Sequence, residues 1–141
     1  MNVFLDSSVL LAACGSAAGA SRAVIEMAAR QRWQLLSSAY VIAEAEANLA
    51  ALPAGGADNR ARIRDMLQKV PDVLSFEWPA VFAPARDRPI LFTTSAWAEV
   101  LLTLDRRDFA DLLGKSFYGL AILRPGEFLQ RERAAGRLVP E

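Results

Sequence analysis

The sequence predicts an α/β fold, a three-layer α/β/α sandwich in which helices cover both faces of a central, mostly parallel sheet. Short apolar segments alternate with segments of helical periodicity, which is typical of parallel strands joined by helices. The 141 residues are the size of one domain, and a hydrophobic content of 53% is enough for a core. Because the chain shows no internal repeat and no interdomain linker, we expect a single domain over residues 1–141.

The first half of the chain predicts two strands and three helical segments. Val3–Leu5 predicts a buried strand, and a stretch rich in Gly, Ser and Ala follows it. Helical spacing then appears in Ala23, Val24, Met27 and Ala28, and a second strand is expected at Trp33–Leu36. Two more helices should follow: one capped by Ser37 or Ser38, with Val41, Ile42, Ala45, Leu49 and Leu52 on one face and ending at Pro53–Asp58, and one from about Ala61 to Val70.

The second half predicts three more strands and two helices. In chain order they are a strand at Val73–Phe76, a helix at Ile90–Ala98, strands at Val100–Thr103 and Gly119–Leu123, and a closing helix that starts at Pro125 and continues through Phe128 and Leu129.

Charge and composition exclude several classes of function. Sixteen basic and sixteen acidic residues cancel, so a polyanionic partner would have to bind a local patch of the surface. With one Cys and no His, the chain has no intrachain disulfide, no Cys/His zinc site and no imidazole acid–base chemistry. The chemistry must therefore use carboxylates, hydroxyls, Arg or Lys.

The apolar start of the chain resembles an export signal, but Asp6 interrupts it and no basic segment precedes it. No apolar run reaches the roughly 18 residues that span a bilayer. We therefore expect a cytoplasmic protein that does not enter a membrane.

Carboxylates follow two of the predicted strands. Asp6 comes directly after Val3–Leu5, and Asp105 follows Val100–Thr103 after one Leu. The carboxyl edge of an open parallel sheet is where ligands bind, so these two side chains should converge there. Asp87 precedes the helix that begins near Pro89, and Asp108 lies one helical turn after Asp105.

A cluster of such acids with no Lys or His among them would repel itself unless a cation were present, and hard oxygen ligands select Mg²⁺ or Mn²⁺. Ser7 and Thr103 could orient the ligands or complete the coordination. Taken singly, Asp6, Asp87 and Asp105 also suit helix N-caps, since each precedes a predicted helix.

Glu44 and Glu46 lie on the same predicted helix but on opposite borders of its apolar face. At about 100° per residue they are roughly 160° apart around the axis, so both cannot reach one cleft. By default, each is a solvated flank residue, and periodicity alone does not indicate which border faces the sheet edge.

The ordered motifs resemble the PIN-domain family of metal-dependent ribonucleases, which includes the toxins of VapBC-type pairs. The matching segments are "VFLDSSVLL", "SSAYVIAEAEANL", "DRPIL", "LLTLDRRDF" and "AILRPGEFL". The resemblance touches nearly the whole chain, and the first and fourth of these segments are the more specific.

The resemblance implies an endoribonuclease that hydrolyses RNA phosphodiester bonds with Mg²⁺ or Mn²⁺, held by Asp6, Glu44, Asp87 and Asp105, with Asp108 secondary. It also implies a cognate antitoxin and a homodimer, to which surplus apolar residues such as Trp33, Trp78, Phe82 and Trp97 could contribute. Four arginines flank these acids and could bind RNA phosphates, although Arg beside Asp is also an ordinary surface ion pair: Arg86, Arg88, Arg106 and Arg107.

Two other interpretations of the sequence were considered: a silent PIN-like module, which stays open, and a phosphoaspartyl enzyme or receiver domain, which the sequence disfavours. A catalytically silent PIN-like module that binds a protein partner is compatible with every motif. A phosphoaspartyl enzyme also places Asp at a strand end, but the dehalogenase type requires a second Asp at position 8, which is Ser. A receiver domain would need paired acids after the first strand and a Lys on a late strand, and neither is evident.

Overall fold

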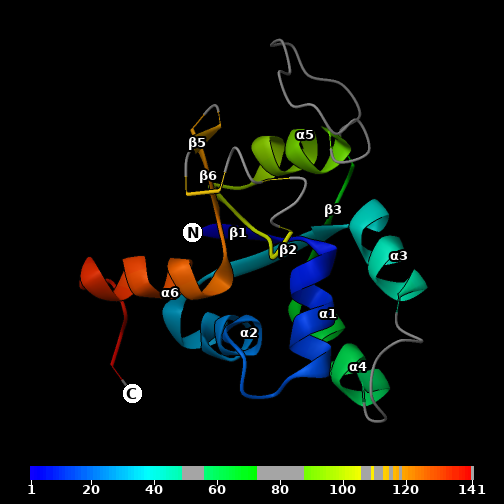
Figure 1. Cartoon of the computed structure of the whole chain (residues 1–141), viewed down its shortest axis with the longest axis horizontal. Coiled ribbons are helices and arrows are strands. Elements are labelled where there is room, and N and C mark those ends of the chain that lie inside the picture. Colours follow the sequence, from blue (N-terminus) through cyan, green and yellow to red (C-terminus); the bar gives the residue numbers. More distant parts are fainter. Residues whose placement is uncertain are drawn as a thin grey trace.

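A six-stranded sheet in the order β3-β2-β1-β4-β6-β5 forms the centre of the molecule (Figure 1). This computed structural model describes residues 1–48, 56–72, 88–105, 109, 113–114, 116–117 and 119–140. The strands are β1 (Asn2–Leu5), β2 (Gln34–Ser38), β3 (Gln68–Val70), β4 (Val100–Leu102), β5 (Ser116–Phe117) and β6 (Leu120–Leu123). All pairings are parallel except that of β5, which runs antiparallel to β6 at one edge.

Helices cover both faces of the sheet, as the sequence predicts. They are α1 (Ser7–Gly15), α2 (Ala20–Gln31), α3 (Ala39–Ala47), α4 (Gly56–Met66), α5 (Arg88–Trp97) and α6 (Pro125–Ala134). Figure 1 shows α5 on one side of the sheet and α1, α2 and α6 on the other. The three-layer α/β/α sandwich is therefore confirmed.

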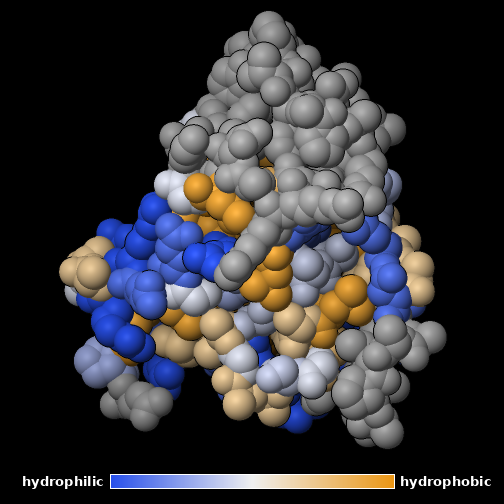
Figure 2. Space-filling model, viewed as in Figure 1, coloured by the Kyte–Doolittle hydropathy of each residue, from blue (hydrophilic) through white to orange (hydrophobic). Residues whose placement is uncertain are grey.

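The core lies on the two central strands. Val3, Phe4 and Leu5 of β1 are fully buried, as are Leu101 and Leu102 of β4. Strands covered on both faces are continuously apolar for this reason, and each fully buried side chain of this size stabilises the fold by about 1.5–3 kcal/mol. Figure 2 shows the opposite composition at the surface, where hydrophilic residues gather over α6.

The predicted helix from Ala61 to Val70 is wrong in its second half. Helix α4 ends at Met66, and Gln68–Val70 form β3, which pairs with β2. The apolar spacing of Ile63, Met66, Leu67 and Val70 is helical, but strand pairing overrides local periodicity in so short an edge strand. The strand predicted at Val73–Phe76, and Leu49 and Leu52 of the preceding helix, lie outside the described residues.

Two elements were given no bounds in the sequence analysis, although Asp6 was expected to precede a helix. Helix α1 follows β1 directly, and its buried residues include Val9, Leu10, Ala13 and Cys14. This apolar face is so broad that it hides the helical period. Strand β5 has two residues and exists through its pairing with β6.

Among the described helices, none is by itself long and apolar enough to cross a membrane; α1 and α2 reach that length only together, across a bend of 96°.

Candidate active site

The chain changes direction in the sheet between β1 and β4. From β1 the chain continues outward through β2 and β3, and then returns to the other side of β1 to form β4. Connections that leave neighbouring strands in opposite directions open a crevice at their carboxyl ends, where open α/β sheets bind ligands. Asp6 and Asp105, which follow these two strands, therefore lie at the edge where a site is expected.

Asp6 serves both as a helix cap and as the central carboxylate of this edge. Its backbone is extended, and its Oδ1 accepts a hydrogen bond of 2.8 Å from the Ser7 amide at the start of α1. Its Oδ2 accepts hydrogen bonds from the hydroxyls of Thr103, at 2.7 Å, and Ser8, at 3.1 Å. The N-cap interpretation of Asp6 is thus confirmed, but it accounts for only one of the two carboxylate oxygens.

The environment of Asp6 disfavours its negative charge. The residue is only 3% exposed. Burial raises the pKa of Asp6, the hydrogen bonds from Thr103, Ser7 and Ser8 oppose that rise, and the charge of Glu44 adds to it. A cation bound beside Asp6 would favour the ionised form.

Glu44 approaches Asp6 through Ser7. The Ser7 hydroxyl donates to Glu44 Oε1 at 2.9 Å, while its amide donates to Asp6. Helix α3 carries Glu44 and has Ser38 as its N-cap, whose hydroxyl accepts a hydrogen bond of 3.4 Å from the Val41 amide. One serine therefore connects two carboxylates that come from different elements.

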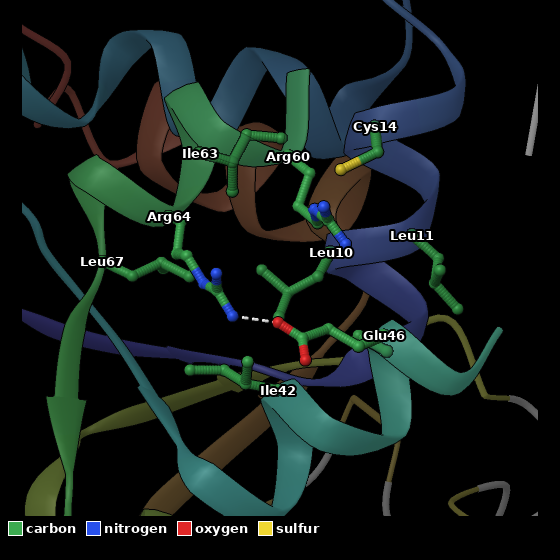
Figure 3. Close-up of a pocket in the computed structure, with 10 residues that line it drawn as sticks. Leu10, Leu11, Cys14, Ile42, Glu46, Arg60, Ile63, Arg64 and Leu67 are labelled. Carbon is green, nitrogen blue, oxygen red and sulfur yellow. Dashed lines mark hydrogen bonds and ion pairs between the residues drawn. The ribbon is translucent and has the colours of Figure 1, made fainter. Parts of the chain in front are cut away.

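Glu46 lies on the other side of α3 and pairs with Arg64 of α4 (Figure 3). Apolar side chains from α1, α3 and α4, among them Leu10, Ile42 and Ile63, line the shallow pocket around this ion pair. The two glutamates thus occupy opposite borders of the helix, as their spacing predicts, and Glu44 is the one beside Asp6.

Hydroxyl groups connect the loop after β4 to Asp6. Thr103 Oγ1, which donates to Asp6, accepts a hydrogen bond of 3.1 Å from the Asp105 amide. Ser8 Oγ likewise accepts one of 3.0 Å from the Leu104 amide. The backbone of Asp105 is therefore held one hydroxyl away from Asp6. Ser8 was not among the candidate residues, although a hydroxyl two residues after an N-cap Asp is a signal for it.

The remaining candidates cannot be placed in this site. Asp87, Asp108, Arg86, Arg106 and Arg107 lie outside the described residues, as does the side chain of Arg88, which begins α5. Within the part of the chain that the structure describes, no three Asp, Glu, Cys or His side chains are close enough to hold a metal ion. Asp6 and Glu44 contribute hard oxygen donors that suit Mg²⁺ or Mn²⁺, and a complete ligand set would need further acids.

Comparison with known proteins identifies the fold. No family model and no curated protein sequence matches the chain. A crystal structure of VapBC2 from Rickettsia felis, bound to a DNA fragment from their promoter, contains a chain that matches with a TM-score of 0.56 at 14% identity, covering 86% of this chain and 97% of that one. The chain has a PIN-like fold. A second structure with similarity to this PIN-like fold is Mycobacterium tuberculosis VapC20, a sarcin–ricin-loop-cleaving toxin, with a TM-score of 0.46 at 12% identity over 77% of this chain and 94% of that one.

Proposed function

We propose that the chain is a divalent-metal-dependent endoribonuclease that hydrolyses RNA phosphodiester bonds and acts as the toxin of a toxin–antitoxin pair. One observation carries the proposal: the buried Asp6 and the exposed Glu44 are connected by Ser7 at the carboxyl edge where the sheet of a PIN-like fold opens. Two like charges held close together at a sheet edge repel each other, and a bound cation would offset that repulsion.

Asp6 and Glu44 would hold the ion, together with the predicted ligands Asp87, Asp105 and Asp108. When bound, Mg²⁺ or Mn²⁺ lowers the pKa of a coordinated water and offsets the charge of the scissile phosphate. No His is needed for this chemistry, which suits a chain that has none.

The hydroxyl residues hold the Asp6 carboxylate in position. The hydroxyls of Thr103 and Ser8 both donate hydrogen bonds to Asp6 Oδ2. Each hydroxyl also accepts a hydrogen bond from a backbone amide in the loop after β4. Partners of this kind fix the orientation of a ligand before the ion binds, so little rearrangement is needed when RNA arrives.

We also propose an antitoxin partner, since the similar fold of VapBC2 was crystallised as a complex. Co-expression with the product of the adjacent upstream reading frame tests this partnership.

The homodimer and the cytoplasmic location stay predictions. Of the apolar residues considered for a dimer interface, Trp33 packs against Phe128 with ring centroids 4.8 Å apart, whereas Trp97 is 42% exposed. Light scattering of the purified chain measures its oligomeric state.

The test of the enzymatic proposal is cleavage of labelled RNA by the full chain with Mg²⁺, with Mn²⁺ and with EDTA. We expect cleavage only with a divalent ion, and none by Asp6→Asn. Asn is as good an N-cap as Asp, so this variant should remain folded. Equal cleavage in EDTA would overturn the metal-dependent mechanism. Absence of cleavage under every condition would favour the alternative, a silent module that binds a protein partner.

A further inference from the structure

Arg124 lies level with Asp6 at the carboxyl edge of the sheet. Leu5 pairs with Leu102, and Leu102 pairs with Leu123. The next residue of each chain segment continues this row, since the Asp6 amide donates to Leu102 O and the Thr103 amide donates to Leu123 O, both at 3.0 Å. Asp6, Thr103 and Arg124 are therefore successive members of one row across β1, β4 and β6.

Side chains in register on neighbouring parallel strands project to the same face of the sheet. Thr103 follows this rule, because its hydroxyl reaches Asp6 at 2.7 Å. At about 4.8 Å per strand, the Cα of Arg124 is about 10 Å from that of Asp6. An Arg side chain and a phosphate bound beside it can together span this distance.

Among the residues that the structure describes, Arg124 has no partner that accounts for its position. Other arginines of the fold are paired: Arg64 with Glu46, Arg131 with Glu127 and Arg137 with Glu132. Among the described residues, no carboxylate or carbonyl accepts a hydrogen bond from the half-buried Arg124. A guanidinium offers five donors in a planar fork, which matches the oxygens of a phosphate.

Arg124 is also an unfavourable residue for its place in the fold. It is the N-cap of α6 and makes no side-chain cap. The N-caps of α1 and α3 are instead Asp6 and Ser38, whose side chains accept backbone amides. Because a helix N-terminus favours acceptors and negative charge, Arg at this position lowers the stability of α6. Residues that break a local rule in this way tend to mark functional sites.

We propose that Arg124 is an RNA-binding residue that holds a backbone phosphate beside the Asp6–Glu44 carboxylates. This inference rests on the proposed function and names a contact with its substrate. Arg124 belongs to no acidic motif and was not among the candidate arginines, although it directly follows the predicted strand Gly119–Leu123. The register of β6 with β4 is what places it in line with Thr103 and Asp6.

Binding is measured by fluorescence anisotropy of a labelled single-stranded oligoribonucleotide in a salt series, with full-length protein carrying Asp6→Asn to prevent cutting. We expect Arg124→Ser to weaken binding about tenfold and to reduce the slope of log K against log salt by about 0.7, since one phosphate contact is lost. Arg124→Lys should retain most of the slope. The matched control is Arg133→Ser, which removes an exposed charge from the last turn of the same helix.

Thermal unfolding separates a binding role from a structural one. Ser is a better N-cap than Arg, so Arg124→Ser should raise Tm while it weakens RNA binding. In the chain that retains Asp6, Arg124→Ser should raise KM and leave kcat within about threefold, as expected for loss of a binding contact.

If Arg124→Ser binds RNA with the same affinity and salt dependence as Arg133→Ser, the inference is wrong, even if the unmodified chain cuts RNA. If instead the unmodified chain cuts no RNA but binds it through Arg124, the proposed enzymatic function is wrong and the phosphate contact stands. RNA binding by none of the proteins would overturn the inference.

Discussion

The two oxygens of Asp6 have different tasks. Oδ1 caps α1 through the Ser7 amide, and Oδ2 receives the hydroxyls of Thr103 and Ser8. Burial raises the pKa of this carboxyl, and the nearby Glu44 raises it further. A residue kept for capping alone would not need a site this costly for its charge, because an exposed Asp caps a helix equally well.

Replacement of Thr103 tests whether its hydroxyl positions Asp6. Thr103 is fully buried. Thr103→Val removes the hydroxyl that donates a hydrogen bond to Asp6 and accepts one from the Asp105 amide. We expect a loss of about 1–3 kcal/mol in unfolding free energy and at least a tenfold loss in kcat/KM. Thr103→Ser, which retains the hydroxyl, should keep most of both; equal defects in the two variants would contradict the positioning role.

Glu44 and Glu46 provide a matched pair on one helix. Glu44→Gln should lose most metal-dependent cleavage, because it removes a proposed metal ligand that is connected to Asp6 through Ser7. Glu46→Gln should keep cleavage within a few-fold, or about 1 kcal/mol in the barrier, since its charge is engaged by Arg64. Rate measurements that show a dead Glu46 variant and an active Glu44 variant would reverse the assignment.

At the scale of elements, α3 is positioned by its N-terminus. Ser38 caps it, and the carboxylate of Asp72, two residues beyond β3, accepts a hydrogen bond of 3.1 Å from the Tyr40 amide. These contacts connect α3 to the carboxyl edge of the sheet, where Asp6 follows β1. The place of Glu44 therefore depends on how the helix begins.

Ser38→Ala tests this dependence. Loss of the cap should cost about 1 kcal/mol, which corresponds to roughly 3 °C in Tm for a chain of this size. Cleavage should also fall, because the first turn of α3 frays and Glu44 lies one turn beyond it. Ser38→Thr keeps an acceptor and serves as the control. Unchanged cleavage in Ser38→Ala, despite a lower Tm, would show that Glu44 is positioned by other contacts.

At the scale of the whole molecule, binding of an ion should stabilise the folded chain. Asp6 and Glu44 come together only on folding, so Mg²⁺ or Mn²⁺ binds the native state preferentially and raises Tm. We expect this rise in the unmodified chain and a much smaller one in Asp6→Asn, measured by thermal unfolding against a NaCl control of equal ionic strength. Equal rises in the two proteins would place the ion elsewhere.

Much of the fold follows from the sequence. Val3–Leu5, Val100–Thr103 and the segment before Pro125 are predicted as strands because buried parallel strands are continuously apolar. The same strands place Asp6 and Asp105 at one edge, since residues that follow parallel strands share it. The opposite borders of Glu44 and Glu46 follow from helical geometry alone.

Only the tertiary structure decided the rest. Local periodicity predicts a helix at Gln68–Val70, but pairing with β2 makes it a strand. Periodicity does not show which border of α3 faces Asp6; the Ser7 hydroxyl and Arg64 determine that. The role of Ser8 and the row that joins Asp6, Thr103 and Arg124 depend on strand register. Register is set by contacts between residues far apart in the chain, and no local pattern in the sequence records it.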